Sequence, residues 1–367
     1  MADWPQWRGA LRNGITSETV GWRGGKPRQL WQATVGQGFS SVAVVGSKLY
    51  TLGNVNNTDW VHCLDAASGK VVWQYRYACP AGDYPGTRAT PTVHNGNIYT
   101  MSREGVALCL NASTGKVVWQ QKLVGAIPQW GLCGSPLIAG SRAIYNVGTN
   151  GTALDKTTGR ILWQTGAAAA GYAAPVPYSV GGQSGIAIFA AKGLVAVNAA
   201  NGRTLWQYPW ETNYDVNAAD PIFSGDQVFI SSNYGKGGAL LKLGAGPPSV
   251  VWQTRAMKNH FNTCVLVNGH LYGNDENTLR CLEWATGRER WALKGIDKGG
   301  LILAGNQLIV MGGRGELILL SATPEKLVEQ ARASVLTGTC WTPPALANGV
   351  LYCRSQEGTL VALNMRG

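Results

Sequence analysis

Six polar or aromatic side chains could do chemistry in this sequence, because each replaces a small residue at the corresponding position of a repeated pattern. His260 is the candidate catalytic residue, since an imidazole that titrates near neutral pH suits a general base. Lys298 or Arg88 could then stabilise a developing negative charge. A histidine with no carboxylate partner in view can equally be a structural or ligand-binding group. The candidate ligand-binding residues are Arg88, Asn217, His260, Asn262, Lys298 and Trp341.

Other kinds of catalytic or metal centre find little support. There is no Gly-x-Ser-x-Gly motif, and Cys264 would lie about 13 Å from His260 along a strand. The eight cysteines form no Cys-x-x-Cys pair and have no histidine at metal-ligand spacing, so we expect no metal site. For calcium, the nearest set is Asn217 with Asp215 or Asp220, which could equally be turn residues.

Charge and hydropathy bear on location and partners. The chain has 367 residues, a formal net charge of +11 and a pI near 9.3, which would attract anionic partners or simply favour solubility. The Lys and Arg residues form no run of five, so we expect no nucleic acid partner. No stretch approaches the roughly 20 apolar residues of a membrane span. The start Met-Ala-Asp suits a chain that begins just past a removed signal peptide, which predicts a periplasmic or secreted monomer.

The elements that must position these side chains come from one recurring motif. It is an apolar strand, an Asp or Asn, two residues, a Thr or Ser, a Gly, a basic residue, two residues and a Trp. The acid or amide and the glycine predict a tight turn between two strands. The Trp then begins a strand whose ring fills the space between sheets. Copies are LDAASGKVVW (64–73), LNASTGKVVW (110–119), LDKTTGRILW (154–163), VNAANGRTLW (197–206), LEWATGRERW (282–291) and a degraded LGAGPPSVVW ending at Trp252.

The spacing of this motif predicts blades of a propeller. The Trp positions 31, 73, 119, 163, 206, 252 and 291 are separated, by subtraction, by 42, 46, 44, 43, 46 and 39 residues, one four-stranded blade per step. A further unit at 317–330, with Glu329 in place of the Trp, gives eight outer strands. Eight inner hairpins, from 40–50 to 343–353, agree with that number.

The two ends of the chain predict how the ring closes. The segment 359–367 is a third strand without an outer partner, and 24–32 is an unpaired outer strand. We expect them to pair, which leaves no open sheet edge. The predicted fold is all-β, a single eight-bladed β-propeller over 24–367, with residues 1–23 as an arm packed on it.

The motif [DN]-x-x-[TS]-G-x-x-x-W resembles the tryptophan-docking repeat of the pyrroloquinoline quinone (PQQ) binding-like propellers, over about residues 24–367. One branch of that family comprises dehydrogenases that oxidise alcohols or sugars with PQQ and an axial calcium ion. Another includes an outer-membrane assembly lipoprotein, a scaffold without cofactor. This chain lacks both the adjacent cysteine pair of the first branch and an N-terminal lipid-acceptor cysteine. Its WPQWRG segment (4–9) is similar to that of exported bacterial propellers.

The propeller topology predicts where a site would lie. When the eight inner strands are aligned on their terminal aromatic residues, one equivalent position in each strand is expected to lie near the axis. Side chains alternate along a strand, so His260 and Asn262 would lie on one side and Phe261 on the other. That position holds Thr87, Asn217, His260, Lys298 and Cys340, and the next holds Arg88, Ala218, Phe261, Gly299 and Trp341. Loops on the same face add rings suited to sugars, peptides or quinones, or to blade packing, among them Tyr84, Trp130, Tyr172, Trp210, Tyr214 and Tyr234.

Three functions follow from these observations. The first is an exported binding protein that holds a glycan, small molecule or peptide at the channel mouth. The second is a dehydrogenase that binds PQQ with calcium in a modified site. The third is an envelope scaffold with a protein partner and an inert channel, in which the polar side chains bond one another and buried waters.

Overall fold

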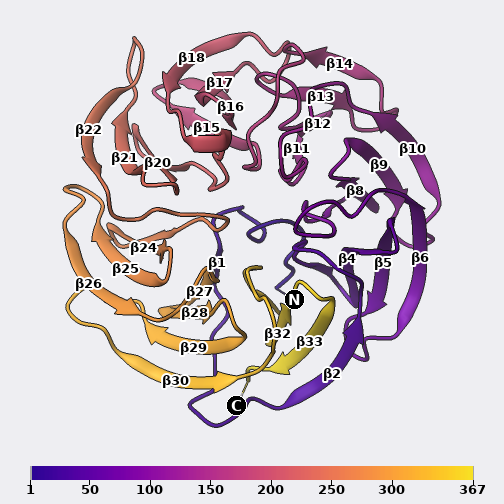
Figure 1. Ribbon diagram of the computed structural model, residues 1–367, viewed down its shortest axis with the longest axis vertical. Helices are drawn as coiled ribbons and strands as arrows, with labels where there is room; N and C mark the ends of the chain where they lie inside the picture. Colours follow the sequence, from indigo (N-terminus) through magenta and orange to yellow (C-terminus); the bar gives the residue numbers. More distant parts are fainter. Residues whose placement is uncertain (1, 367) are drawn as a thin grey trace.

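The computed structural model describes residues 2–366 and is a ring of eight β-sheets around a central axis (Figure 1). The predicted fold, an eight-bladed β-propeller of four-stranded blades, is confirmed. Residues 1 and 367, at the outer ends of the two predicted divisions, lie outside the described residues. Within 2–366 there is one short 3-10 helix, η1 (Asn213–Asp215), and no helix has the length and apolar character of a membrane span.

We number the blades 1 to 8 in chain order, each from its inner to its outer strand. Blades 1 and 2 are β3 (Ala43–Val45), β4 (Lys48–Val55), β5 (Thr58–Asp65), β6 (Val71–Ala78) and β7 (Thr92–His94), β8 (Asn97–Met101), β9 (Val106–Asn111), β10 (Val117–Lys122). Blades 3 and 4 are β11 (Leu137–Ala139), β12 (Arg142–Tyr145), β13 (Thr152–Asp155), β14 (Ile161–Gln164) and β15 (Val176–Val180), β16 (Gln183–Ala190), β17 (Gly193–Val197), β18 (Thr204–Pro209). Blades 5 and 6 are β19 (Ile222–Ser224), β20 (Gln227–Ser232), β21 (Gly237–Lys242), β22 (Ser249–Thr254) and β23 (Val265–Val267), β24 (His270–Asp275), β25 (Thr278–Glu283), β26 (Glu289–Lys294). Blades 7 and 8 are β27 (Gly300–Ala304), β28 (Gln307–Met311), β29 (Glu316–Ser321), β30 (Glu329–Ser334) and β31 (Ala345–Ala347), β32 (Val350–Arg354), β33 (Thr359–Asn364), β2 (Gln29–Thr34), while β1 (Ile15–Thr16) adds a fifth strand to blade 7.

Blade 8 closes the ring with strands from both ends of the chain. The strand β2 pairs antiparallel with β33, with Gln32 opposite Val361, as the sequence predicted for these two segments. Arg354 of β32 also joins blade 8 to blade 1, since its buried guanidinium donates to the carbonyls of Gly36, Ser40 and Leu52. Pairing the two ends leaves the ring without a gap between its first and last blades.

The motif glycine and tryptophan hold neighbouring blades together, in a contact that we call the tryptophan dock. Trp73 of blade 1 donates from its indole Nε1 to the carbonyl of Ala112 in blade 2, at 2.9 Å. Its ring lies on Gly115, where φ is +71° and an added Cβ would be 2.6 Å from a ring carbon. Glycine is needed there both for its backbone and for its lack of a side chain. Docks with an indole-to-carbonyl bond involve Trp31, Trp73, Trp119, Trp163, Trp252 and Trp291.

The junction between blades 7 and 8 uses the N-terminal segment instead. Blade 8 has no turn between its third and outer strands, because these come from opposite ends of the chain, so a tryptophan at the dock position of blade 7 would have no turn to dock on. By strand register that position is Ala331, opposite Leu319, and the prediction that Glu329 replaces the motif Trp is wrong by two residues. Glu18 accepts the amide protons of Asn348 and Gly349 here, and Trp22 is buried in the adjoining core. The absence of a motif Trp in blade 7 therefore follows from the position of the ring closure.

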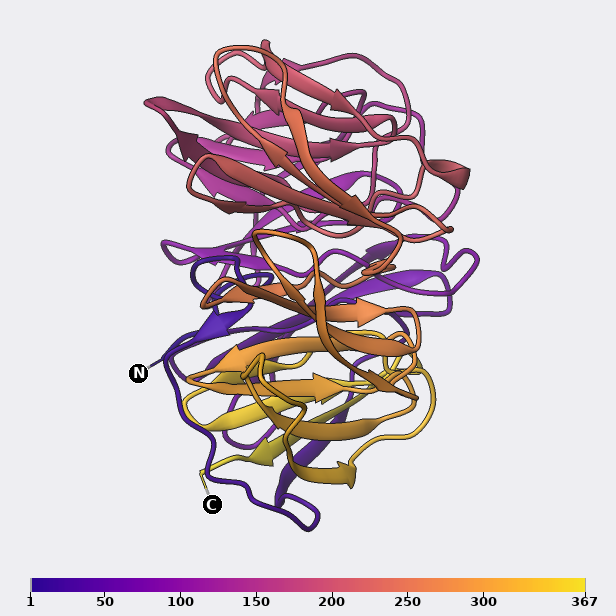
Figure 2. The same cartoon turned by 90° about the vertical axis from the view of Figure 1, so that its left-hand side faces the viewer.

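Residues 2–14 cross one end of the central channel. Figure 1 shows this segment passing over the middle of the ring, and Figure 2 shows it on one face. Trp4 forms a bridge with Val44 of blade 1, while the guanidinium groups of Arg8 and Arg12 donate to the carbonyls of Cys264 and Pro136. The segment thus contacts blades on several sides of the axis and closes the channel at this face.

Candidate functional site: the axial cavity

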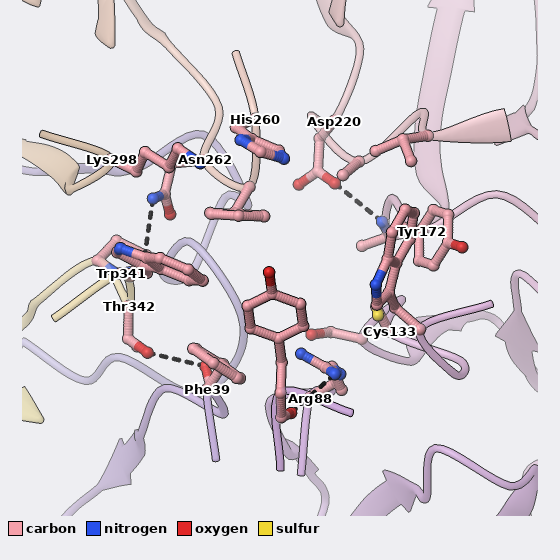
Figure 3. A pocket seen from close by; sticks show the side chains of 18 of the residues that line it. Phe39, Arg88, Cys133, Tyr172, Asp220, His260, Asn262, Lys298, Trp341 and Thr342 are labelled. Atoms are coloured by element: carbon pink, nitrogen blue, oxygen red, sulfur yellow. Dashed lines mark hydrogen bonds between the residues drawn. The ribbon is translucent and has the colours of Figure 1, made fainter. Parts of the chain in front are cut away.

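A cavity of about 300 Å³ lies in the central channel, and the arm residue Trp7 is part of its wall. Figure 3 shows the cavity from close by. Because the arm crosses one end of the channel, Trp7 closes the cavity at that end. Aromatic rings make up much of the remaining wall. The aromatic lining residues are Trp7, Phe39, Tyr84, Trp130, Tyr172, Tyr234, Phe261 and Trp341, and the polar or charged ones include Arg88, Cys133, Asp220, His260, Asn262, Lys298 and Thr342.

Irregular segments ahead of the innermost strands carry these side chains. His260, Phe261 and Asn262 precede β23 and have no strand conformation, so the predicted alternation along a strand is wrong here. All three line the cavity. Lys298 and Trp341 reach it in the same way ahead of β27 and β31, because only three to five residues of each inner strand are paired. The free backbone of these segments can aim consecutive side chains at the axis.

One wall of the cavity is a run of stacked rings. Trp341 stacks on Phe39, with ring centroids 5.7 Å apart, and on Phe261 at 4.7 Å, with interplanar angles of 17° and 24°. Phe261 in turn stacks on His260. The Lys298 ammonium lies 5.6 Å from the Trp341 ring centroid, within the range of a cation–π contact. Trp130 lies against Tyr172, Tyr214 and Tyr234. Figure 3 shows Cys133 and Tyr172 across the opening from Trp341 and Lys298, with Arg88 beside Phe39, whose ring centroid is 5.1 Å from the guanidinium carbon.

His260 is held as a neutral imidazole. The Asn233 Oδ1 accepts the Tyr234 amide proton, so its Nδ2 donates to His260 Nδ1, at 2.9 Å. This bond leaves the proton on Nε2, which lies 3.3 Å from the Tyr234 hydroxyl. Burial and then the Lys298 charge lower the pKa of His260 to about 3. With its one lone pair already accepting a bond, His260 is arranged as a hydrogen-bonding group, and the geometry does not favour a general base.

The positive charges in the cavity are not balanced by its one lining carboxylate. Asp220 accepts from Trp7 Nε1 at 2.7 Å and from the Ala174 amide at 2.9 Å, and its carboxylate is 4.0 Å from Arg8. The Arg8 guanidinium therefore already neutralises the Asp220 carboxylate. Arg88 donates only to the carbonyls of Asp83 and Tyr84, and burial lowers its pKa, although a guanidinium stays protonated in proteins. The cavity therefore presents uncompensated positive charge.

Three polar atoms of the wall have no partner within residues 2–366. They are the Asn262 Oδ1, the Arg88 Nε and the Tyr172 hydroxyl, all shielded from solvent. The Asn262 amide nitrogen donates to the carbonyls of Gly299 and Trp341, which fixes the side chain and leaves its oxygen free to accept. Buried polar atoms are normally hydrogen-bonded, so these three indicate that something polar enters the cavity, a ligand or water.

Five of the six predicted ligand-binding residues line the cavity, namely Arg88, His260, Asn262, Lys298 and Trp341. Asn217 does not. Its amide donates to the carbonyls of Ala190, Ala191 and Trp210, and its oxygen accepts from Ser232, so it is fully used in joining blades 4 and 5. Sequence reasoning missed Trp7 and Phe39, which the repeat alignment cannot place because they lie in the arm and in the first irregular segment.

The residues nearest to a predicted calcium set do not assemble into one. The Asn217 side chain is hydrogen-bonded within the protein, and the Asp215 carboxylate pairs with Lys192 at 2.8 Å. Within residues 2–366, no three His, Cys, Asp or Glu side chains are grouped to hold a metal ion. All eight cysteines are free, and among the cavity-lining residues Cys133 supplies the thiol.

Comparisons with known proteins agree with the fold. Residues 57–293 match the model of a PQQ family described as outer membrane protein assembly factor BamB. No curated protein sequence matches the chain. Among solved structures, BamB from Moraxella catarrhalis is 17% identical, with a TM-score of 0.69 over 92% of this chain and 100% of that one. A europium-containing methanol dehydrogenase is 13% identical, with a TM-score of 0.71 over 99% of this chain and 89% of that one. The quinohemoprotein alcohol dehydrogenase from Comamonas testosteroni is 13% identical, with a TM-score of 0.74 over 100% and 81%. At these identities the structural likeness concerns the fold alone.

Proposed function

This chain belongs to the PQQ-repeat family whose model is described as outer membrane protein assembly factor BamB, and from that premise we propose that it is an exported binding protein for a planar, negatively charged small molecule. The proposed site is the axial cavity. One observation carries this proposal: a cavity walled by stacked aromatic rings contains two cations, Arg88 and Lys298, and its one carboxylate is already neutralised by Arg8.

The shape and chemistry of the wall favour a flat aromatic body. Offset stacking on an aromatic ring of the wall stabilises a planar ligand by roughly 0.5–1.5 kcal/mol beyond the burial of its area. A volume of about 300 Å³ is at the small end of ligand pockets, enough for a compact two- or three-ring molecule. Sugars and peptides also bind to aromatic walls, and the paired cations are the reason to prefer an acid.

The proposed ligand contacts follow from the free groups. A carboxylate would pair with Lys298 or Arg88, since hydrogen bonds between ionised groups are the stronger ones. The Asn262 oxygen would accept a hydrogen bond from an N–H or O–H group of the ligand. The imidazole of His260 would contribute its neutral face and edge rather than take a proton.

A pair of matched compounds tests this proposal. We expect 2-naphthoate to quench the intrinsic tryptophan fluorescence of the protein and to bind more tightly than 2-naphthamide, which has the same shape without the charge. Lys298→Met should weaken 2-naphthoate binding by about fivefold or more and leave 2-naphthamide unchanged, while Lys242→Met, an exposed residue on blade 5, serves as the control. Equal affinity for the acid and the amide, or no effect of Lys298→Met, would refute the proposal.

A PQQ-dependent oxidoreductase is the second candidate, favoured by the same aromatic wall and cations, because PQQ is itself a planar polyacid. The residues present suit the quinone body and its carboxylates but supply no set of carboxylates for calcium. We therefore derive no dehydrogenase step. Reconstitution with PQQ, with and without calcium, followed by absorbance and dye-linked oxidation of alcohols and aldoses, tests this candidate.

An envelope scaffold is the third candidate, and the description of the matched family favours it. A periplasmic or secreted location and a monomeric state belong with each of the three proposals. Pull-down from envelope extracts, with Lys298→Met beside the wild type, separates scaffold from ligand binding. A partner recovered equally by both proteins, with no ligand bound in the cavity, would favour the scaffold.

A further inference from the structure

The junction between blades 4 and 5 departs from the other tryptophan docks. Trp206 is the motif tryptophan of blade 4, but within residues 2–366 its indole N–H donates to no backbone carbonyl of the next blade, unlike the six docked tryptophans. The carbonyl that corresponds by strand register to Ala66 and Ala112 of other blades is that of Leu243, just after β21. An open groove of about 410 Å³ lies here, lined by Tyr178, Trp206, Asp226, Leu243 and the following residues 244–246.

Two extra residues in the turn explain the missing dock. Five motif turns place the tryptophan eight residues after the Asp, Asn or Glu, as in Asp65 to Trp73, by subtraction. From Lys242 to Trp252 the separation is ten, and the turn contains Pro247 and Pro248. The longer turn stands away from the ring, since an ideal Cβ at Gly244 or Gly246 would have no atom within 4 Å, whereas one at Gly115 would strike Trp73.

The other junctions identify what Trp206 lacks. At three docks, a tyrosine hydroxyl and the tryptophan N–H donate to one and the same carbonyl oxygen of the next blade. Tyr50 and Trp73 both donate to Ala112 O. The other two pairs are Tyr99 with Trp119, on Lys156 O, and Tyr352 with Trp31, on Ala66 O. The acceptor belongs to a glycine-containing turn in each case.

A tyrosine also lies beside Trp206, although from another strand: Tyr178 belongs to β15, whereas Tyr50, Tyr99 and Tyr352 lie on the second strand of their blades, where blade 4 has Ala187. Tyr178 lies edge-on to Trp206, with ring centroids 5.5 Å apart, and the residue is 6% exposed. Burial raises the pKa of Tyr178, and a side-chain hydrogen bond with Trp206 lowers it in part, so the indole N–H can donate to the tyrosine oxygen. The buried hydroxyl proton of Tyr178 has no acceptor in the described chain, and an oxygen from outside would supply one.

From this geometry we infer a second binding site: the Trp206 groove takes a glycine-containing turn of a partner polypeptide, whose backbone carbonyl accepts from Trp206 and Tyr178. A carboxylate is the poorer occupant, because the one charged residue lining the groove is the acid Asp226. Asp226 already pairs with Lys242 of the same blade, 3.5 Å away, so the groove carries no unpaired charge and suits a neutral backbone carbonyl. A second copy of the chain is not the occupant, since its own turns of this type are docked within its ring.

A peptide that copies the docked turn tests the inference on the full chain. The probe is a cyclised, fluorescein-labelled hairpin of residues 108–118, with the turn Asn-Ala-Ser-Thr-Gly-Lys, and the readout is fluorescence anisotropy. We expect binding to the wild type and about fivefold weaker binding to Trp206→Phe, which keeps a ring and loses one neutral donor. The hairpin with Gly115→Val should bind at least tenfold more weakly, because it needs a left-handed backbone and would strike the ring.

Two further variants control for folding and place the site. Trp163→Phe removes the same donor from a closed dock and should leave peptide binding unchanged. A variant with residues 243–249 replaced by Ala-Ala-Ser-Gly-Lys, the sequence of 66–70, would fill the groove from within and should abolish binding. Absence of peptide binding to the wild type, equal binding of the glycine and valine hairpins, or equal loss in Trp206→Phe and Trp163→Phe would overturn the inference. Because 2-naphthoate is expected only in the axial cavity, it should not compete with the hairpin.

Discussion

Replacing one of two glycines in blade 2 should separate the energy of a tryptophan dock from that of a turn. Gly115 and Gly96 both have a left-handed backbone, with φ of +71° and +75°. An added Cβ at Gly96 would meet nothing within 4 Å, whereas at Gly115 it would lie 2.6 Å from a carbon of the Trp73 ring. Alanine at the two positions therefore imposes the same backbone strain and differs in the clash alone.

The expected magnitudes follow from these contacts. A left-handed non-glycine residue costs about 1–2 kcal/mol, so Gly96→Ala should lower the free energy of unfolding by about that amount. At Gly115 the ring must also move, which adds roughly 1–3 kcal/mol of overpacking, and the bond from Trp73 to Ala112 O, worth about 1 kcal/mol, is lost. We expect Gly115→Ala to cost about 3–6 kcal/mol in total.

Equilibrium urea unfolding of both variants, followed by circular dichroism, measures this difference. The slope of the transition must agree with that of the wild type, so that the midpoints report stability. Trp73→Phe is the companion variant, because it should reduce the additional cost of Gly115→Ala. Equal destabilisation by Gly96→Ala and Gly115→Ala would refute the dock as a source of stability.

Three other predictions concern the buried charged and titratable groups. Burial, followed by the Arg354 charge, lowers the pKa of His62 from 6.5 to about 4. The free energy of unfolding should therefore fall by about 3 kcal/mol as the pH drops from 6.5 toward 4, because the unfolded state binds the proton more tightly. A pH series of unfolding midpoints should be flatter for His62→Gln than for the wild type. Asp220→Asn leaves the buried Arg8 without its acid and should cost about 3–5 kcal/mol, with faster proteolysis of the arm, whereas exposed Asp226→Asn should behave as the wild type. Binding of 2-naphthoate should be constant from about pH 5 to 8, because the His260 pKa of about 3 lies below that range, and titration of fluorescence quenching at each pH would expose a protonation step if one exists.

The sequence predicted the fold because each residue type of the motif has a structural role. The glycine in LNASTGKVVW marks both a left-handed turn and a ring contact, and the tryptophan marks the strand that precedes the next blade. Seven motif tryptophans therefore mark seven of the eight blades. The absence of one in blade 7, where Ala331 stands at that position, follows once the ends of the chain pair in blade 8.

The candidate site was only partly predictable, for reasons that lie in the irregular segments. The positions of Arg88, His260, Lys298 and Trp341 follow from the repeat, since they interrupt it near the axis. Asn217 interrupts it as well, yet its amide joins two blades. Only the backbone carbonyls around a polar side chain decide between these roles, and no spacing in the sequence encodes them. Trp7 reaches the cavity through an arm that belongs to no repeat.

The two sites proposed here arise from different departures from the same repeat. At the axis, polar and aromatic side chains replace small ones, while the blades themselves keep their docks and the cavity keeps a rigid frame. At Trp206 the tryptophan of the dock is kept and its acceptor is withdrawn, because the turn after β21 is longer by two residues. A docked tryptophan has little left to offer a partner, whereas Trp206 lacks its carbonyl and the neighbouring Tyr178 hydroxyl has no acceptor in the described chain. In a repeat protein, the retained half of a contact whose other half is missing is therefore as informative about binding as an unusual side chain.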